Sequence, residues 1–446
     1  MLPGLRGPGQ ILVVSCYELG RQPIAAAGAL AALEAQGFQP AVQDVAVHAL
    51  DAGPVLRAGL VAISVPMHTA LRLGVRVAEK VRAINPSAHV AFFGLYAALN
   101  KEHLLAARHC DSVVEGEALA PLVALARSLD SGAEVAQQPE SRGALPSRGA
   151  LPLLAHYAKL EGHGAPKLVA SVEASRGCKH LCRHCPIVPV YQGHFIAVPR
   201  ETVLADIEQQ LSQGAEHVTF GDPDFLNGPT HALRIARELH RRWPQVSFDA
   251  TIKIEHLLQH RDLLPELSVC GCLFITSAVE SLSDRVLFEL RKGHTAAEVP
   301  LALAEVRAAG IDLRPTLLPY TPWTELSDLP ALFDFAERHQ LVDQIDPVQF
   351  TLRLLLPPGS ALLADPEEPR PWLGALEPAS FSWNWTHLDP RVDALQRASS
   401  LAAQAGAGFD QLRALALGAA GLAAAPPVRA RPARRTVPRL TEPWFC

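Results

Sequence analysis

Residues 168–186 read LVASVEASRGCKHLCRHCP, and this stretch decides how the second half of the chain is organised. Its first seven residues are mostly apolar and predict a buried strand. Three cysteines follow at once, Cys178, Cys182 and Cys185, in the spacing C-x3-C-x2-C. Three thiolates on one short loop can hold three corners of a [4Fe–4S] cluster, which leaves the fourth iron open for another ligand.

Other interpretations of the three cysteines stay open at this point. A structural zinc site would need a fourth ligand at finger-like spacing, and His180 or His184 inside the loop could supply it. A disulfide pair and a chance spacing are the remaining alternatives. Cys270 and Cys272 lie at the start of a later strand, where we expect small buried residues and no second cluster.

Strand and helix patterns alternate from residue 168 onward. Helical stretches separate six predicted strands, at residues 168–174, 217–220, 246–252, 272–277, 313–318 and 348–354. Six such units predict a partial (β/α)6 TIM-type barrel, a fold in which the chemistry lies on the loops that follow the strands. The cysteine loop directly follows the first strand, where that rule places a site.

The first 130 residues alternate in the same way. Apolar runs at 10–15, 60–65, 89–93 and 112–114 are separated by helical stretches, among them 24–36 and 69–84. Continuous apolar strands predict a parallel sheet covered on both faces. The predicted fold class is therefore α/β, with an N-terminal doubly wound, Rossmann-like domain before the barrel. Such a domain binds ligands at the carboxyl ends of its strands.

We expect the Rossmann-like domain at 1–131, a linker at 132–160 and the barrel at 161–360. A C-terminal helical extension at 361–425 and a Pro/Arg-rich tail at 426–446 complete the chain. The linker holds the hexapeptide SRGALP twice, at 141–146 and 147–152, and we expect it to be exposed and free in length.

Composition excludes several classes of protein. The chain has 446 residues, 49% of them hydrophobic and 19% charged, with a net charge of −5, which gives no argument for nucleic acid or membrane binding. The apolar run at 414–425 is too short to span a bilayer, and the N-terminus has no secretory signal pattern. Eight cysteines in so long a chain do not form a disulfide scaffold, so we expect a cytoplasmic protein.

The cysteine loop on the first strand of such a barrel resembles the signature of the radical SAM (S-adenosylmethionine) superfamily, and the resemblance covers residues 168–356. It implies that Cys178, Cys182 and Cys185 are the metal ligands and that the open iron chelates the amino and carboxylate groups of SAM. It also implies a small-molecule substrate and an external electron donor such as flavodoxin or ferredoxin.

Two further segments carry the resemblance. Gly221 and Asp222 end the second strand, where the family has a Gly-rich turn that meets the amino group of SAM; an ordinary turn is the alternative. Glu280 and Ser281 lie in SAVES, which is similar to the family's G-x-E-S segment with Ala278 in place of the Gly. The resemblance implies that Glu280 accepts hydrogen bonds from the ribose of SAM. A salt bridge to an arginine such as Arg291, or charge compensation at a helix N-terminus, is the alternative.

Polar residues on the later strands are further candidates for cofactor binding. Alternation places Lys253 on the same face as Asp249 and Thr251, either inside the barrel or in solvent at the strand end. Arg353, like Arg314, could hold a carboxylate of SAM or of the substrate. Tyr320 is a candidate on the same grounds.

The N-terminal domain resembles the cobalamin (B12)-binding class of the superfamily, with VVEGEA at 113–118 as the detailed match. The candidate contact loops contain Cys16, Tyr17, His68, Gly94, Glu115 and Gly116. The sequence has no D-x-H-x-x-G motif, and Phe93 stands beside Gly94 where a second glycine is usual. His68 is either an axial ligand or a capping or core residue. Cobalamin binding and a vestigial domain both remain open. We expect these loops to face the mouth of the barrel.

The resemblance implies reductive cleavage of SAM to modify a small molecule, with cobalamin-dependent methyl transfer as one form of that reaction. A first alternative is transfer of the 3-amino-3-carboxypropyl group of SAM to a thiophilic acceptor such as trivalent arsenic. This alternative comes from the ending TEPWFC at 441–446, which resembles the CUAEP/CCAEP-tail group if Cys446 is its first cysteine; an incidental cysteine is the other interpretation. A second alternative is an iron–sulfur or metal-binding sensory module without turnover.

Overall fold

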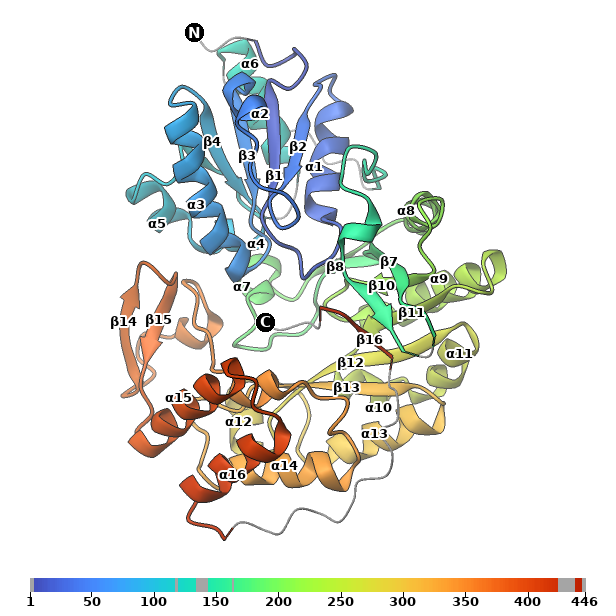
Figure 1. Cartoon of the computed structure of the whole chain (residues 1–446), viewed down its shortest axis with the longest axis vertical. Helices are drawn as coiled ribbons and strands as arrows, with labels where there is room; N and C mark the ends of the chain where they lie inside the picture. Colours follow the sequence, from blue (N-terminus) through green and yellow to red (C-terminus); the bar gives the residue numbers. More distant parts are fainter. Residues whose placement is uncertain (1–3, 117–118, 134–142, 163, 424–437, 443–446) are drawn as a thin grey trace.

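The computed structural model describes residues 4–116, 119–133, 143–162, 164–423 and 438–442 (Figure 1). Glu117, Ala118 and the ending at Cys446 lie outside the described residues. The N-terminal part and the barrel form two α/β layers that face each other. The Pro/Arg-rich tail is described only at 438–442, where the chain returns to the barrel sheet.

The N-terminal sheet is parallel throughout, in the order β2-β1-β3-β4-β5. The central strands β1, β3 and β4 consist of apolar residues that are almost all buried, as the sequence predicted. The edge strand β2 was not predicted, because its sequence AVQD has little apolar character and only its last residue is buried. The strands are β1 (Ile11–Ser15), β2 (Ala41–Asp44), β3 (Leu60–Ser64), β4 (His89–Phe93) and β5 (Ser112–Val113).

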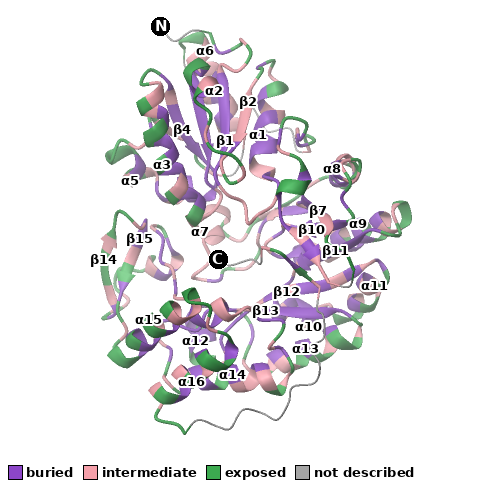
Figure 2. Ribbon diagram, in the orientation of Figure 1, coloured by how far each residue is buried: buried purple, intermediate pink, exposed green. Residues whose placement is uncertain are grey.

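Helices cover both faces of this sheet, which confirms the doubly wound prediction. One face packs on α1 (Ile24–Glu34) and α6 (Ala120–Ser131). The other face packs on the long amphipathic α3 (His68–Ile84) and on three short helices. These are α2 (Ala52–Arg57), α4 (Leu95–Leu99) and α5 (Lys101–Ala106). In Figure 2 the strands form a buried layer between the helices.

The second sheet contains five adjacent parallel strands, which curl into the partial barrel. They are β7 (Lys167–Val172), β10 (His217–Phe220), β11 (Ser247–Thr251), β12 (Cys272–Glu280) and β13 (Asp312–Leu317). Two short antiparallel strands, β6 (Lys159–Glu161) and β16 (Arg439–Leu440), extend the sheet beyond β7. The chain's last described segment thus becomes the outermost strand.

Helices pack around the outside of the barrel sheet. They are α8 (Arg200–Leu211), α9 (Pro229–Arg242), α10 (Ile254–Gln259), α11 (Leu264–Val269), α12 (Asp284–Glu289), α13 (Glu298–Ala308) and α14 (Asp328–Arg338). The short α7 (Ile187–Tyr191) belongs to the segment that follows the cysteines.

The sixth predicted strand, at 348–354, is wrong. Residues Pro347–Thr351 form a 3-10 helix, and Arg353 makes only an isolated parallel bridge to Tyr320. The side chain of Gln349 accepts a 3.0 Å hydrogen bond from the backbone N–H of Leu317. A side-chain oxygen therefore satisfies this donor at the edge of β13, where a sixth strand would have supplied a carbonyl.

The expectation of an exposed linker is also wrong, because Arg148 in the second SRGALP copy is 1% exposed. Its guanidinium binds both oxygens of Asp206, at 2.6 and 2.8 Å, and the backbone oxygen of Ser171 in the barrel. It also donates to Gln22 of the N-terminal domain. The linker therefore joins the two domains through a buried network of hydrogen bonds and an ion pair around Arg148. Its length cannot vary freely at this point.

The C-terminal extension is not helical throughout: a short 3-10 helix (Ala361–Leu363) and a β-hairpin precede its two α-helices. The hairpin pairs β14 (Leu373–Glu377) with β15 (Ser382–Trp385), and α15 (Pro390–Gln404) and α16 (Phe409–Ala419) follow. Phe381 at the hairpin turn packs into the core of the N-terminal domain. Within the described residues, no helix combines the length and the apolar character that crossing a membrane requires.

Candidate active site

The three cysteines lie on a loop that a small hairpin holds at the carboxyl end of β7. The hairpin pairs β8 (Ser175–Gly177) with β9 (Phe195–Ala197). Gly177 has φ +76°, and a Cβ there would lie 2.3 Å from the Tyr191 ring and 2.6 Å from the backbone oxygen of His194. Only glycine fits this turn, which leads directly into Cys178.

Asn227, just beyond β10, holds the first cysteine in place. Its Oδ1 accepts a hydrogen bond from the backbone N–H of Lys179 at 3.2 Å and lies 3.6 Å from the Sγ of Cys178. Its Nδ2 donates to the backbone oxygen of Gly177 at 3.3 Å. One buried amide side chain therefore fixes both ends of the turn. Sequence reasoning missed Asn227, and its place just after a barrel strand was the available signal.

The thiols lie among charged groups of both signs, with Asp224 near Cys178 and a lysine near each of Cys178 and Cys185. Cys178, Cys182 and Cys185 are all free. Burial raises the pKa of Cys178 and raises that of Cys185 to about 12, while the positive charges of Lys253 and Lys292 act in the opposite direction. Three thiols with two facing ammonium groups form a donor set that fits an iron–sulfur cluster, because its thiolate ligands bring negative charge.

Glu280 forms a buried ion pair with Lys292 beside the cysteines. The Lys292 Nζ lies 3.2 Å from Glu280 Oε1, and so does Nε2 of His184 in the cysteine loop. Burial raises the pKa of Glu280, but Lys292 and His184 more than offset this and hold the pKa at about 2. The partner of Glu280 is therefore Lys292 and not the neighbouring Arg291, which was the alternative expected from the sequence.

Glu280 also has an unusual backbone. Its φ is +64°, and the β12–β13 register shifts between Ala278 and Glu280. A left-handed conformation in a residue other than glycine is uncommon and marks a position fixed by its surroundings. Ser281 follows directly, with its backbone N–H bonded to the Val279 oxygen and its Oγ accepting from Ser283 N–H.

Asp222 hydrogen-bonds the residues that lead into the cysteine loop. Its Oδ2 accepts from the backbone N–H of Ala174 at 2.8 Å and its Oδ1 accepts from the Ser175 hydroxyl at 2.6 Å. Burial raises the pKa of Asp222 to about 7. Gly221 donates its N–H to Val172 at 2.7 Å. Both carboxylate oxygens of Asp222 are thus used to hold the start of the cysteine loop. The prediction that this turn binds SAM therefore depends on the backbone groups of Gly221 and Asp222.

Two other predicted cofactor residues lie in different surroundings. Lys253 is buried beside the cysteine loop, with its Nζ 3.1 Å from Glu255. Arg353 instead points to the C-terminal extension, where it binds Asp393 and the backbone oxygen of Trp385, both at 2.6 Å. Its guanidinium lies 3.4 Å from the centre of the Trp385 ring. The structure therefore brings Lys253, and not Arg353, close to the thiols.

Of the remaining candidates on the later strands, Asp249, Arg314 and Tyr320 are buried and Thr251 is half-buried. Asp249 accepts hydrogen bonds from Thr219 at 2.6 Å and from the ring of His217 at 2.9 Å. Arg314 lies 3.3 Å from Asp346. Cys270 and Cys272 are buried, and burial raises the pKa of both thiols, which agrees with small core residues at the bottom of the barrel.

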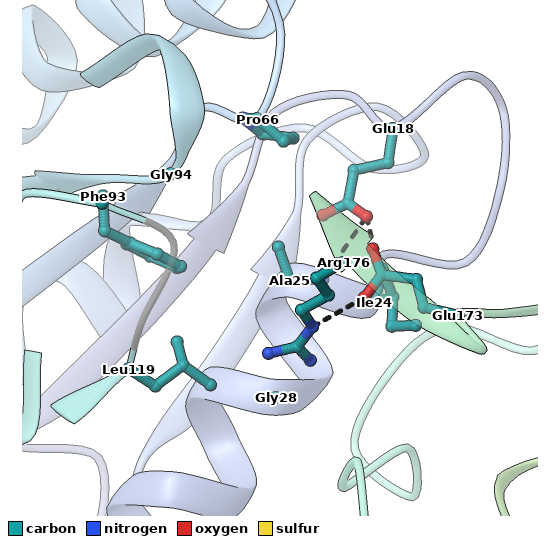
Figure 3. Close-up of a pocket in the computed structure, with 11 residues that line it drawn as sticks. Glu18, Ile24, Ala25, Gly28, Pro66, Phe93, Gly94, Leu119, Glu173 and Arg176 are labelled. Carbon is teal, nitrogen blue, oxygen red and sulfur yellow. Dashed lines mark hydrogen bonds and ion pairs between the residues drawn. The ribbon is translucent and has the colours of Figure 1, made fainter. Parts of the chain in front are cut away.

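A cavity of about 100 Å³ opens where the two domains meet (Figure 3). Pro66, Gly94 and Gly116 of the N-terminal domain line it at the carboxyl ends of β3, β4 and β5, and Glu173 and Arg176 of the barrel close it. The strand ends of the two domains thus face each other, as the sequence predicted. The cavity has room for a part of a large cofactor.

Glu18 also lines this cavity. Its Oε2 accepts from the backbone N–H groups of Ile24 and Ala25 at the start of α1, at 2.8 and 3.4 Å. Its Oε1 makes no hydrogen bond to any residue that the structure describes. Burial raises the pKa of Glu18 to about 8, so the carboxyl is largely protonated at neutral pH.

The other residues predicted for the N-terminal site are dispersed. Cys16 is fully buried in the core, Tyr17 hydrogen-bonds Glu442, and Glu115 pairs with Lys101 on the surface. His68 begins α3, with its Nε2 2.5 Å from the backbone oxygen of Ser380 in the C-terminal hairpin. This contact ties His68 to the hairpin and does not cap α3, whose N-cap is Met67 without a side-chain cap hydrogen bond. Gly94 and Gly116 line the cavity.

A family model and several curated relatives match this chain in the barrel region. The family model "Radical SAM superfamily" matches residues 172–332. Curated relatives include the tRNA-2-methylthio-N(6)-dimethylallyladenosine synthases of Haemophilus influenzae, 28% identical over 158 residues, and of Pseudomonas paraeruginosa, 30% identical over 157 residues. Each match covers 32% of this chain. The chain spans about a third of the length of these relatives, 32% and 34%.

Solved structures match over most of the chain. The radical S-adenosylmethionine methyltransferase TsrM from Kitasatospora setae, with cobalamin and a [4Fe–4S] cluster bound, has a TM-score of 0.63 at 15% identity, covering 84% of this chain and 81% of that one. The cobalamin-dependent S-adenosylmethionine radical enzyme OxsB, with aqua-cobalamin bound, has a TM-score of 0.64 at 15% identity, covering 87% and 66%. At these identities the likeness shows a shared two-domain fold.

Proposed function

We propose, from the premise that the barrel of this chain belongs to the radical SAM superfamily, that the protein cleaves SAM reductively at a cluster held by Cys178, Cys182 and Cys185. One observation carries the proposal: the three thiols share one loop at the carboxyl end of β7, faced by Lys253 and Lys292. When bound, the cluster supplies the electron that breaks a carbon–sulfur bond of SAM.

The residues around the loop have separate tasks in this proposal. Asn227 and Gly177 fix the turn, Asp222 fixes its start, and the Glu280–Lys292 pair borders it on the side of β12. The backbone at Gly221 and the carboxylate of Glu280 are the proposed contacts for SAM. Because Lys292 and His184 already bind one oxygen of Glu280, its other oxygen is the one proposed to meet the ribose.

Metal content tests the ligand assignment. The protein, purified and reconstituted without oxygen, should hold one [4Fe–4S] cluster per chain, measured by iron, sulfide and visible absorbance. Replacing all three cysteines by alanine should remove it. The Cys270→Ala and Cys272→Ala variants provide the control, because these thiols are buried at the far end of the barrel. Iron at the parent level in the triple variant would refute the assignment.

We further propose that the N-terminal domain binds cobalamin and that the overall reaction is methyl transfer to a small molecule. Two observations support this proposal: the cavity faces the barrel, and the fold is similar to the cobalamin-bound structures over more than four fifths of the chain. The corrin would supply the methyl carrier, and part of it would occupy the cavity lined by Gly94 and Gly116. His68 is not the proposed axial ligand, since Ser380 occupies its Nε2.

Retention of a corrin tests this second proposal. Mixed with hydroxocobalamin and desalted, the protein should keep about one corrin per chain by absorbance. The His68→Ala variant should retain as much as the parent protein, and Ala25→Phe, which enlarges a side chain that lines the cavity, should retain much less. If the parent protein keeps no corrin while its cluster is intact, the domain is a scaffold and methyl transfer through cobalamin is excluded.

The nature of the cleaved bond separates the alternative reactions. Methyl transfer and hydrogen abstraction yield S-adenosylhomocysteine or 5′-deoxyadenosine, whereas aminocarboxypropyl transfer yields methylthioadenosine. A sensory module would keep the cluster and yield none of the three. Mass spectrometry of the reaction with SAM and a strong reductant identifies the product.

A further inference from the structure

Two histidines and an aspartate meet beside the cysteine loop without using any of its thiols. His180 belongs to the loop itself, Asp224 follows β10, and His256 lies in α10 after β11. One ligand atom from each residue lies within 4.8 Å of the others. The two Nε2 atoms are 3.1 Å apart, and Asp224 Oδ2 is 2.8 Å from His256 Nδ1 and 3.9 Å from His180 Nε2.

Two of the three residues are buried, so their polar atoms need partners within the protein. Asp224 is 0% exposed and His256 1% exposed. Among the described residues no group makes a hydrogen bond to His256 Nδ1, and Asp224 Oδ2 lies 2.8 Å away at ion-pair distance. A buried polar nitrogen without a hydrogen bond calls for a physical explanation. A cation shared by the nitrogen and the carboxylate provides one, since it binds lone pairs and needs no N–H.

We propose that His180, Asp224 and His256 bind one divalent transition-metal ion, of the zinc or ferrous class. Imidazole nitrogens and carboxylate oxygens bind such ions at about 2.0–2.2 Å. Ligand atoms around one ion are therefore about 3–3.5 Å apart. One ligand atom from each of the three residues lies within 4.8 Å of the others, so side-chain adjustment would bring them to that spacing. Two histidines and one carboxylate leave coordination positions open, as in other sites of this composition.

The surroundings orient the ligands. Asp224 uses its Oδ1 to accept from Leu226 N–H at 2.9 Å, and its Oδ2 accepts from the backbone N–H of Lys253 at 3.3 Å, so the second lone pair of Oδ2 is the one available to the site. Glu255 Oε2 lies 3.4 Å from Nδ1 of His180, on the opposite side of the ring from His256. A carboxylate behind a ligating histidine is the usual way in which such a ring is oriented. The ion would tie the cysteine loop to the segments that follow β10 and β11.

Zinc binding by the intact protein tests the site without relying on SAM cleavage. The cluster-loaded protein is treated with one equivalent of Zn²⁺, desalted, and analysed for zinc and iron by mass spectrometry and by X-ray absorption at the zinc edge. We expect about one zinc per chain with only nitrogen and oxygen ligands, at about 2.0–2.2 Å, and an unchanged iron content. Zinc in the thiol site would instead show sulfur at about 2.3 Å.

Variants assign the zinc to these residues. His256→Asn and the isosteric Asp224→Asn should each lower retained zinc at least five-fold, with iron at the parent level. His260→Asn is the matched control, because its ring lies 5.4 Å from that of His256 but is not one of the three ligands; it should retain zinc. The spectrum of the parent protein needs no variant, so a misfolded variant would not leave the site untested.

Three results would overturn the proposal: less than about 0.2 zinc per chain, sulfur in the zinc shell, or full zinc retention in His256→Asn. SAM cleavage measured in the same preparations keeps this inference separate from the proposed function. Zinc bound as expected without any SAM cleavage would reject the proposed function and leave the metal site standing.

Discussion

Gly177 shows how a single residue sets the geometry of the cysteine loop. Its φ of +76° is costly for alanine, and a Cβ would overlap both the Tyr191 ring and a backbone oxygen. Gly177→Ala should therefore displace Cys178 and lower iron retention at least two-fold after anaerobic reconstitution. Gly164→Ala is the control, because its φ is also positive but nothing lies within 4 Å of a Cβ there. Equal iron in the two variants would contradict this account of the loop.

The Glu280–Lys292 pair is the second prediction at this scale. Removing one partner of a buried ion pair leaves the other charge uncompensated and costs about 3–5 kcal/mol. Glu280→Gln should lower the unfolding free energy of the cluster-free protein by an amount of that order, since the Lys292 side chain is only 3% exposed. The double variant Glu280→Gln/Lys292→Met should be more stable than Glu280→Gln alone. Urea unfolding measures both, and a double variant less stable than either single one would contradict the pairing.

At the scale of elements, the loop from β1 to α1 should impose a pH dependence on stability. Glu18 has its pKa raised to about 8 by burial, against about 4.3 in an unfolded chain. A raised folded pKa means that the stabilisation is fully present below about pH 4 and is lost as the pH rises through 8. Glu18→Gln should therefore flatten this dependence and make the protein more stable than the parent at pH 9, by on the order of 1 kcal/mol or more.

Thermal unfolding between pH 5 and pH 9 measures the effect of Glu18. The exposed Glu115→Gln provides the comparison, because Glu115 pairs with Lys101 on the surface and should leave the profile unchanged. A parallel pH profile for Glu18→Gln and the parent would show that Glu18 is not buried in the way described.

Elements with a strong apolar pattern could be predicted from the sequence, and those fixed by side-chain contacts could not. β10 begins and ends as predicted, and β1, β3 and β4 differ by at most one residue. β2 escaped because an edge strand needs little apolar character. The run at 348–354 was taken for a strand, but Gln349 satisfies the sheet edge with its side chain. The local sequence pattern does not show that a side-chain oxygen takes the place of a strand's backbone carbonyl.

The candidate site was predictable only in part, for a similar reason. The spacing of the cysteines identified the ligands, and position along the strands identified Glu280 and Lys253. Asn227 and the meeting of His180 with His256 depend on segments brought together by the fold. Arg353 had the right residue type and the wrong surroundings, since Asp393 and Trp385 hold it in the C-terminal extension.

For the whole molecule, the buried contacts of Arg148 with Asp206 and Gln22 should fix the position of the two domains relative to each other. Its side chain is 0% exposed and that of Asp206 4% exposed. Arg148→Met should cost about 3–5 kcal/mol of unfolding free energy, because Asp206 would remain buried without a partner. Arg6→Met, which removes an arginine from an exposed pair with Asp130, should cost less than about 1 kcal/mol. Equal losses of unfolding free energy in Arg148→Met and Arg6→Met, measured by urea unfolding, would contradict a stabilising role for the buried Arg148–Asp206 pair.

The C-terminal hairpin is a second connection between the domains, through Phe381 in the N-terminal core and Ser380 on His68. The barrel, the extension and the Rossmann-like domain therefore act as one frame around the cysteine loop. The strand ends of both domains converge on that loop, which is the geometric basis for placing the chemistry there (Figure 1).

The measurement that tests the central claim most directly is SAM cleavage by the anaerobically reconstituted protein with a strong reductant, followed by mass spectrometry. We predict a product of reductive cleavage, 5′-deoxyadenosine or methylthioadenosine, that disappears in each of Cys178→Ala, Cys182→Ala and Cys185→Ala and persists in Cys272→Ala. A fully loaded and reducible cluster that leaves SAM intact, or product formation that survives loss of the three thiols, would contradict it.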